Sequence, residues 1–258
     1  MPVAPPAEVS LEVVPDAVVT AVKRGDLRTD HPPRRWMTGA VHRADGSLVV
    51  DSQRRWNGEA KAPVPADPDR VPSRGTAEEL PGAWLYGGHW SKHFGHFLLE
   101  VITSLWPEPG TVQPHGLLFH RSFRGGLPKN TDAPAPPALS SWQRDMLSLA
   151  GYGDLPVLTV QRRRTRVEEL TVPSRPLSLR QWAQPEATAV WHRMAAAVPP
   201  TEGPQRVFLS RSAFNASATG WHVRSSPDWD ERVEREVVRH GFTVVTPEVL
   251  SIAEQIAL

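Results

Sequence analysis

Proline constrains the folding of this chain more than any other feature, because it supplies 27 of the 258 residues, against a usual share of about 5%. Each proline fixes φ and lacks an amide donor, so regular elements can form only in the intervals between prolines. Apolar residues still make up 40% of the chain, which is ordinary for a globular protein, and they recur along its whole length. The sequence therefore predicts a folded protein of one or two domains with many loops.

The charge balance and the missing cysteines exclude several classes of protein. Lys and Arg number 29 against 28 Asp and Glu, and this net charge of +1 excludes nucleic-acid binding through bulk positive charge. Without cysteine the chain has no disulfide scaffold, thiolate metal site or cysteine nucleophile. No apolar run approaches the roughly 18 residues of a membrane span, and the N-terminus lacks a signal-peptide pattern. We therefore expect a cytoplasmic protein, with peripheral membrane association left open.

Short apolar runs between turn residues predict most of the regular elements. Asp45-Gly46, between residues 38–43 and 48–50, predicts a β-hairpin because this pair readily adopts the positive φ of a tight turn. A polar stretch without periodicity at 57–80 predicts a long surface loop. The other expected strands are 9–14, 83–86, 116–119, 157–160 and 169–172, and the other expected helices are 141–150 and 185–197.

Residues 199–204, rich in proline and glycine, predict a linker between an N-terminal lobe at 1–202 and a C-terminal lobe at 205–258. The C-terminal lobe has the βαβ pattern of a parallel sheet. Its expected elements are strands 206–210 and 242–245, a loop at 212–228, a helix at 229–240 and a second helix that starts with a capping box at Ser251 and Glu254. The chain stops about two turns into that helix, so we expect this lobe to be incomplete.

Residues 89–106 hold the pattern with the most chemistry. Apolar residues recur there at helical spacing, and three histidines and one carboxylate share an arc of about 60° on the helical wheel. These four are His89, His93, His96 and Glu100. One interpretation is a cleft wall in which Glu100 or His96 is a general base. A solvent-facing edge and core histidines bonded to carbonyl groups fit equally well, and the i, i+4 spacing of histidines also fits a zinc site.

A second candidate site is Ser210-Arg211, which ends a predicted strand and opens a loop before a helix. Ligands of α/β sheets bind at the carboxyl ends of strands, and an arginine there suits a diphosphate. The other interpretation is an ordinary surface arginine. A basic run at 162–166 has no aromatic residues nearby for nucleic-acid binding, so we interpret it as a solvated edge strand or loop.

Four segments, taken in order, resemble glycosyltransferase family 61; they are residues 87–100, 166–174, 206–211 and 241–255. The resemblance covers about 85–258. It implies a GT-B-like fold of two Rossmann-like lobes and transfer of a sugar from a nucleotide donor with inversion, and bacterial members are linked to capsular or other surface polysaccharide synthesis. The chain departs from the family at 228–231, where an Asn-Glu pair is common, and it ends before the segment that completes the family's donor site.

Together, the residues and the resemblance predict an α/β, GT-B-like glycosyltransferase with an incomplete C-terminal lobe. The expected base is Glu100 or His96. The other expected site residues are His89 and His93 in the substrate cleft and Ser210 and Arg211 at the donor diphosphate, together with helix N-termini. We expect no cofactor or metal, and as partners a nucleotide sugar and a glycan acceptor but no nucleic acid. The alternatives are a non-catalytic carbohydrate-binding module or degenerate transferase fragment, and a metal-dependent hydrolase that uses the histidines.

Overall fold

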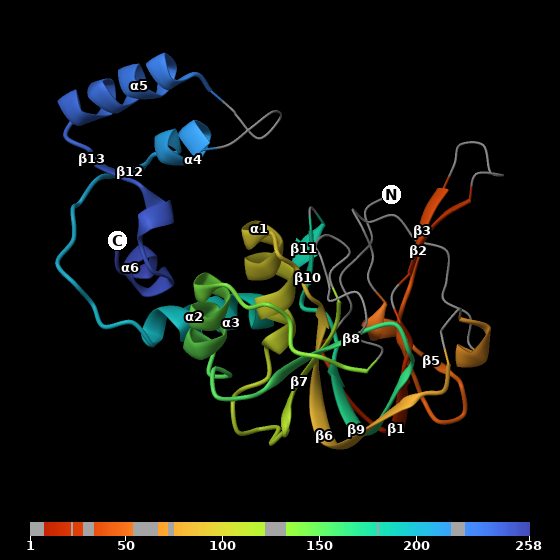
Figure 1. Cartoon of the computed structure of the whole chain (residues 1–258). Coiled ribbons are helices and arrows are strands. Elements are labelled where there is room, and N and C mark those ends of the chain that lie inside the picture. The colour runs from red at the N-terminus through yellow and green to blue at the C-terminus, as the bar shows by residue number, and fades with distance from the viewer. Residues whose placement is uncertain are drawn as a thin grey trace.

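The computed structural model describes residues 8–21, 23–27, 34–53, 67–71, 75–121, 133–179, 181–217 and 225–258 (Figure 1). Its main feature is a mixed sheet of seven strands in the order β5-β4-β1-β9-β6-β7-β8. The strands are β1 (Leu11–Val19), β4 (Val41–His42), β5 (Leu48–Val49), β6 (Glu78–His89), β7 (Gly116–His120), β8 (Val157–Val160) and β9 (Thr165–Pro173). The predicted α/β class is confirmed.

The half of this sheet formed by β9, β6, β7 and β8 is parallel, whereas β1, β4 and β5 pair antiparallel. Parallel strands are covered on both faces and read as continuous apolar runs. All five residues of β7 are buried, and so are the last six residues of β6. Since the four strands run in one direction, their carboxyl ends meet at one edge of the sheet, which is where α/β proteins bind ligands.

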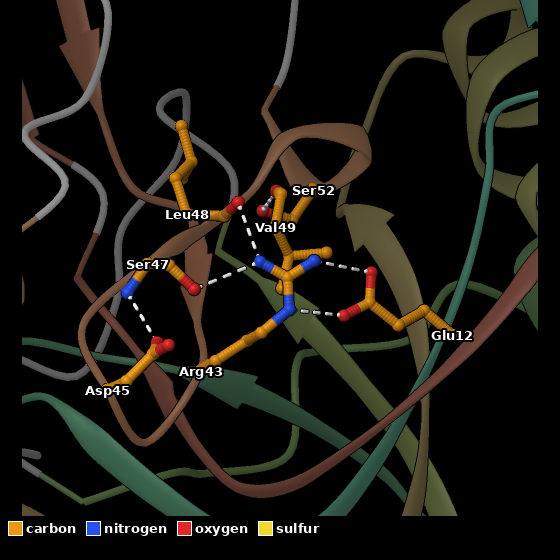
Figure 2. Close-up of polar contacts among 7 residues, drawn as sticks. All are labelled: Glu12, Arg43, Asp45, Ser47, Leu48, Val49 and Ser52. Carbon is orange, nitrogen blue, oxygen red and sulfur yellow. Dashed lines mark hydrogen bonds and ion pairs between the residues drawn. The ribbon is translucent and has the colours of Figure 1, made fainter.

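The hairpin of β4 and β5 is confirmed, and it is tied to β1 by an ion pair (Figure 2). Gly46 supplies the expected positive φ of 84°, and Asp45 accepts a hydrogen bond from the amide of Ser47 at 2.9 Å. Beside this turn, Arg43 donates two hydrogen bonds, of 2.6 and 2.9 Å, to the carboxylate of Glu12. This bidentate contact fixes the position of the hairpin against the neighbouring strand.

Helices cover one face of the parallel strands. Leu85, Leu117 and Phe119 point into a core shared with α2 (Ser141–Leu149), α3 (Pro185–Ala196) and the helical segment at 94–105. The residues that alternate with them, Trp84, Tyr86 and Leu118, belong to a second core cluster with side chains of β1 and β9, because successive residues of a strand point to opposite faces. Both expected helices of this part, at 141–150 and 185–197, are therefore confirmed to within one residue.

Several shorter elements complete this part of the chain. Two antiparallel pairs are β2 (Lys23–Leu27) with β3 (Arg34–Thr38), and β10 (Leu177–Ser178) with β11 (Trp182–Ala183). Single 3-10 turns are η1 (Val50–Ser52) and η2 (Pro68–Arg70). Of the loop expected at 57–80, residues 57–66 and 72–74 lie outside the described residues, and the described part contains η2 and the first three residues of β6.

The predicted βαβ unit near the C-terminus is confirmed, with two corrections. β12 (Val207–Leu209) and β13 (Thr243–Val245) pair in parallel, joined by α5 (Pro227–Arg239). The expected loop at 212–228 instead contains a further helix, α4 (Ser212–Ser217). Helix α5 starts two residues earlier than expected, because Ser226 caps it and Pro227 fits the first turn.

The last helix, α6 (Ile252–Ala257), returns to the core of the large sheet (Figure 1). The expected capping box at Ser251 and Glu254 is confirmed, and η6 (Pro247–Val249) precedes it. Ile252 is only 3% exposed and belongs to the same core cluster as Leu85. The two-lobed GT-B arrangement stays a prediction.

Candidate functional site

The helix expected to start at His89 starts at Phe94 instead. His89 is the last residue of β6, where it pairs with His120 of β7. The helical segment then consists of α1 (Phe94–His96), a π-helical turn η3 (Phe97–Val101) and a 3-10 turn η4 (Ile102–Leu105). The prediction of four polar side chains along one helix is therefore wrong, because the pairing of His89 with His120, after an irregularity at Gly87 and Gly88, prevails over the helical periodicity.

His96 and Glu100 form the closest polar pair of this segment. The Nδ1 atom of His96 lies 2.5 Å from Oε2 of Glu100, and the two side chains are 35% and 20% exposed. A carboxylate at this distance accepts a hydrogen bond from Nδ1–H and so fixes the orientation of the imidazole. His93 is the N-cap of α1, and its ring lies against that of His96 with centroids 5.0 Å apart. Three of the four predicted residues thus remain on the helical segment.

The turn that contains Glu100 is π-helical. Such turns are rare in proteins, but those that occur are often found at functional sites. Two hydroxyl groups from the next turn support it. Thr103 donates to the carbonyl of Leu99, and Ser104 donates to the carbonyl of Glu100, both at 2.7 Å. Glu100 is therefore held through its own backbone as well as through its contact with His96.

A pocket opens beside Glu100 at the carboxyl ends of β6 and β9. It is lined by Gly88, His89, Glu100, Thr103, Ser104, Arg175, Pro176 and Leu177. The strand end thus brings His89 beside Glu100, although the two do not share a helix. His93 and His96 do not line this pocket. The pocket combines a carboxylate, an imidazole and a guanidinium, the groups used for proton transfer and for binding of anions.

A fully buried histidine lies behind His89. The rings of His89 and His120 stack with centroids 4.7 Å apart. His120 donates from Nε2 to the carbonyl of Thr20 at 2.9 Å, and its Nδ1 lies 2.6 Å from the hydroxyl of Tyr86. Burial lowers the pKa of His120 to about 4, so its ring is neutral near pH 7 and Tyr86 donates to Nδ1. The backbone and Tyr86 thus fix the ring against which His89 packs.

Sequence reasoning missed both His120 and Arg175. Each follows or ends an apolar strand, so a polar side chain at the end of a predicted strand is the signal that could have found them. The order of the strands in the sheet was not predicted, and it determines which strand ends meet. For that reason the sequence alone did not place Arg175 near Glu100.

The second predicted site lies directly after β12. Ser210 is 2% exposed, and its hydroxyl contacts the carboxylate of Glu234 in α5 and the hydroxyl of Ser212. Arg211 is exposed, and its guanidinium lies over the ring of Phe214 at 4.7 Å. Both residues line a pocket with Phe208, Leu209, Ser225, Trp229, Asp230 and Val233. Ser210 and Arg211 thus follow a strand, as expected, but α4 begins directly after them where a long loop was predicted.

One acidic side chain of this second pocket is fixed by hydrogen bonds. Asp230 accepts from Ser225 and from Asn215, the latter at 2.8 Å, and these bonds hold the pKa of its carboxyl below the ordinary value. Asp230 is therefore charged near neutral pH. The pocket thus offers one guanidinium, one carboxylate and the exposed indole of Trp229 to a ligand.

The described residues bear on two questions raised by the sequence, whether the histidines form a zinc site and whether a segment could span a membrane. Within these ranges, no group of three or more His, Asp or Glu side chains is placed to hold a metal ion. The zinc interpretation of the histidines therefore has no geometric support, since His89 is separated from His93 and His96. Over the same residues, none of the helices has the length and apolar character needed to span a membrane.

Comparison with known proteins gave one result. The model of the family described as Glycosyltransferase 61 matches residues 94–258, nearly two thirds of the chain. The match runs from α1 to α6 and includes Glu100 and Arg211. No curated protein and no solved structure gave a significant match.

Proposed function

The chain belongs to glycosyltransferase family 61, and on that premise we propose that it moves a sugar from a nucleotide-sugar donor to a glycan acceptor with inversion. In such a displacement, an acceptor hydroxyl oxygen attacks the anomeric carbon and the bond from that carbon to the diphosphate oxygen breaks. The acceptor hydroxyl loses its proton, and the diphosphate leaves with its negative charge. The protein must therefore provide a base and a cationic site.

Glu100 is the proposed base, and its place in the pocket is the observation that carries the proposal. It lines the pocket at the carboxyl ends of β6 and β9, whereas His96 contacts it from outside that pocket. His96 orients the carboxylate through the 2.5 Å contact, and Ser104 holds its backbone. His96 is then a positioning residue, and His89 lines the acceptor site.

Arg211 is the proposed partner of the leaving diphosphate. A guanidinium can donate two parallel hydrogen bonds to phosphate oxygens. Helix α5 begins at the same pocket, but its first turn already contains Asp228 and Asp230. Among the residues that line this pocket, Arg211 is the cation, so we propose that it contacts the diphosphate directly. We also propose that the reaction needs no metal ion.

The first pocket lies at the carboxyl ends of parallel strands in the large mixed sheet, and the second lies at the carboxyl end of β12, which pairs in parallel with β13. This supports the GT-B-like arrangement as a proposal, with the acceptor at Glu100 and the donor at Arg211. The reaction takes place when the two pockets face each other across the sugar. Surface polysaccharide synthesis in the cytoplasm is the proposed setting.

The test of the base is sugar transfer from a panel of nucleotide sugars, measured for the purified full chain. Glu100→Gln should lower turnover by about 10²–10⁴-fold, because the amide cannot accept the proton. His96→Gln should lower it less and shift the pH profile of kcat. Glu202→Gln, on the exposed linker, is the matched control. Turnover of Glu100→Gln equal to that of the control would contradict the assignment.

The test of the donor site is calorimetry with nucleoside diphosphates. Arg211→Ala should weaken binding, and Arg211→Lys should not restore it, because an ammonium group lacks the planar bidentate geometry. Arg239→Ala, on the exposed face of α5, is the control. Nucleotide binding without turnover under any donor would favour the non-catalytic module instead.

A further inference from the structure

Each of the four parallel strands of the large sheet ends in a basic or imidazole side chain or is followed by one within two residues. β6 ends at His89 and β7 at His120, which Arg121 follows. Arg162 comes two residues after β8, and Arg175 comes two residues after β9. The parallel registers, which pair His89 with His120 and His120 with Val160, align these strand ends at one edge.

Arg121 directly follows β7 and Arg162 follows β8 by two residues, and because these two strands pair with each other, the two like charges lie at neighbouring strand ends. The guanidinium of Arg121 is partly buried, and burial together with the charge of Arg162 lowers its pKa. Over the described ranges, neither arginine forms an ion pair. Two like charges at neighbouring strand ends repel each other, and an anion bound between them would offset this repulsion.

The other members of the same basic run do have acidic partners. Arg163 pairs with Glu78 at 2.5 Å, Arg164 pairs with Asp69, and Arg166 lies 3.9 Å from Glu79. These contacts tie the run to the start of β6 and to η2. Residues 162–164 lie in a loop, as one form of the interpretation expected, whereas Thr165 and Arg166 begin β9, which lies inside the sheet and is not an edge strand. Arg162 therefore differs from its neighbours in facing a second cation.

The proposed base lies between the two groups of cations. Arg175 lines the pocket of Glu100 on the side of β9, and its charge contributes to the lowered pKa of His120. Arg121 and Arg162 lie on the other side, beyond β6, at the ends of β7 and β8. Three strand spacings of about 4.8 Å separate β9 from β8, so the row spans roughly 14 Å. A row of this length can contact several units of an extended glycan.

We propose that the acceptor is an acidic glycan, whose carboxylate or phosphate groups bind Arg175 on one side of Glu100 and the Arg121–Arg162 pair on the other. The acceptor hydroxyl then lies at Glu100. This inference rests on the proposed function, and it names the chemical class of the acceptor. Guanidinium groups suit carboxylate and phosphate alike, because both accept paired hydrogen bonds.

The test is calorimetry on the full chain with four probes. Tetragalacturonate carries carboxylates, mannose 6-phosphate carries a phosphate, maltotetraose is uncharged, and a ten-residue oligothymidylate represents nucleic acid. The variant is Arg121→Gln/Arg162→Gln, and the control with the same loss of charge is Arg235→Gln/Arg239→Gln on the exposed face of α5. Because the first variant removes a repulsion, it should fold at least as well as wild type.

We expect wild type and control to bind tetragalacturonate or mannose 6-phosphate, and the variant to bind at least tenfold more weakly. The probe that binds identifies the anion as carboxylate or phosphate. Binding should weaken as salt is raised, and maltotetraose should bind weakly and equally to all three proteins. Equal binding of the acidic probe by variant and control, or preference for maltotetraose or oligothymidylate, would overturn the proposal.

These outcomes are distinguishable from those of the proposed function, because the binding assay requires no sugar transfer. If Glu100→Gln abolishes turnover but acidic probes do not bind, the reaction stands and the acidic acceptor is wrong. If acidic probes bind through Arg121 and Arg162 but Glu100→Gln retains turnover, the acceptor class stands and the base is wrong.

Discussion

β7 of the large sheet and β12 of the small one are both short parallel strands, yet all five residues of β7 are buried and none of the three residues of β12 is. The contrast extends to their surroundings. In the described part of the chain, buried apolar side chains lie between Val14 and Met194, and Ile252 is the one beyond them. Helix α5 has no buried residue at all. Apolar burial therefore stabilises mainly the large sheet, to which α6 also contributes.

Around β12 and β13, polar contacts provide a larger share of the stabilising interactions. Ser210 contacts Glu234 of α5, and Asn215 of α4 donates to Asp230 of α5. Such contacts contribute about 0.5–1.5 kcal/mol each, whereas a buried Leu, Ile or Phe contributes several times as much on truncation. Both regions contain parallel strands, yet their stability should differ. Local unfolding should begin in the smaller region, which consists of β12, β13, α4 and α5.

The sharpest test of this comparison is a pair of phenylalanine truncations. Phe97 is 0% exposed and packs edge-to-face on Trp90 and Trp142, so Phe97→Ala should lower the free energy of unfolding by about 3–5 kcal/mol. Phe242 is only partly buried, and Phe242→Ala should cost about 1 kcal/mol. Urea denaturation followed by circular dichroism measures both. Equal losses would mean that the two regions are stabilised alike.

The next test asks whether α6 belongs energetically to the large sheet. Ile252→Ala removes a side chain that is 3% exposed in the main core, so the free energy of unfolding should fall by about 2–4 kcal/mol. Val249→Ala, three residues earlier and 76% exposed, should change it by less than about 0.5 kcal/mol. If the two variants are equally stable, α6 does not anchor the smaller region.

The pH dependence of the free energy of unfolding tests the large sheet through its buried His120. The folded pKa of His120 is about 4, below its ordinary value of 6.5, so the unfolded chain binds this proton more readily. Stability should therefore be lost as pH falls from 6.5 toward 4, by up to about 1.4 kcal/mol per pH unit from this group. Urea denaturation at several pH values measures the slope, and His120→Gln should flatten it. An unchanged slope in that variant would refute the assignment.

The smallest expected effect is the loss of a helix cap. Ser226 accepts a hydrogen bond from the amide of Trp229 at the start of α5, and Ser226→Ala should cost about 1 kcal/mol. Hydrogen exchange should show this loss at the amides of α5, β12 and β13 only. The matched change Ser140→Ala, at the cap of α2, should be felt across the large sheet. Loss of protection in β6 from Ser226→Ala would show that the regions open together.

The sequence predicted the elements whose signals are local. The Asp45-Gly46 turn, the capping box of α6 and the periodicity of α2 and α3 each depend on residues within a few positions. Pairing between distant segments was not predictable in this way. β6 extends past two glycines to His89 because β7 pairs with it again at that residue, whereas β9 pairs with it only as far as Leu85.

The residues of the candidate site likewise fall into two groups, those that local spacing predicts and those that depend on contacts between distant segments. The contact of His96 with Glu100 follows from one turn of helix, and Ser210-Arg211 follows from the end of one strand. Arg175, which lines the first pocket, and His120, which stacks on His89, could not be assigned to this site, because that requires the order β9-β6-β7. Local spacing finds groups on one element, whereas a pocket between elements depends on the topology of the sheet.

Because α6 packs in the core of the large sheet, the smaller region is connected to the large region at both of its ends. Thr201, on the way out from α3, donates to the carbonyl of Ala257 at 3.2 Å, and Gly203 lies beside Ala257 and Leu258. The chain therefore leaves and re-enters the large region at one point, and β12 to β13 form an insert rather than a tail. A protease cut in the exposed residues 199–206 would nick this insert without releasing it, since α6 remains seated in the core.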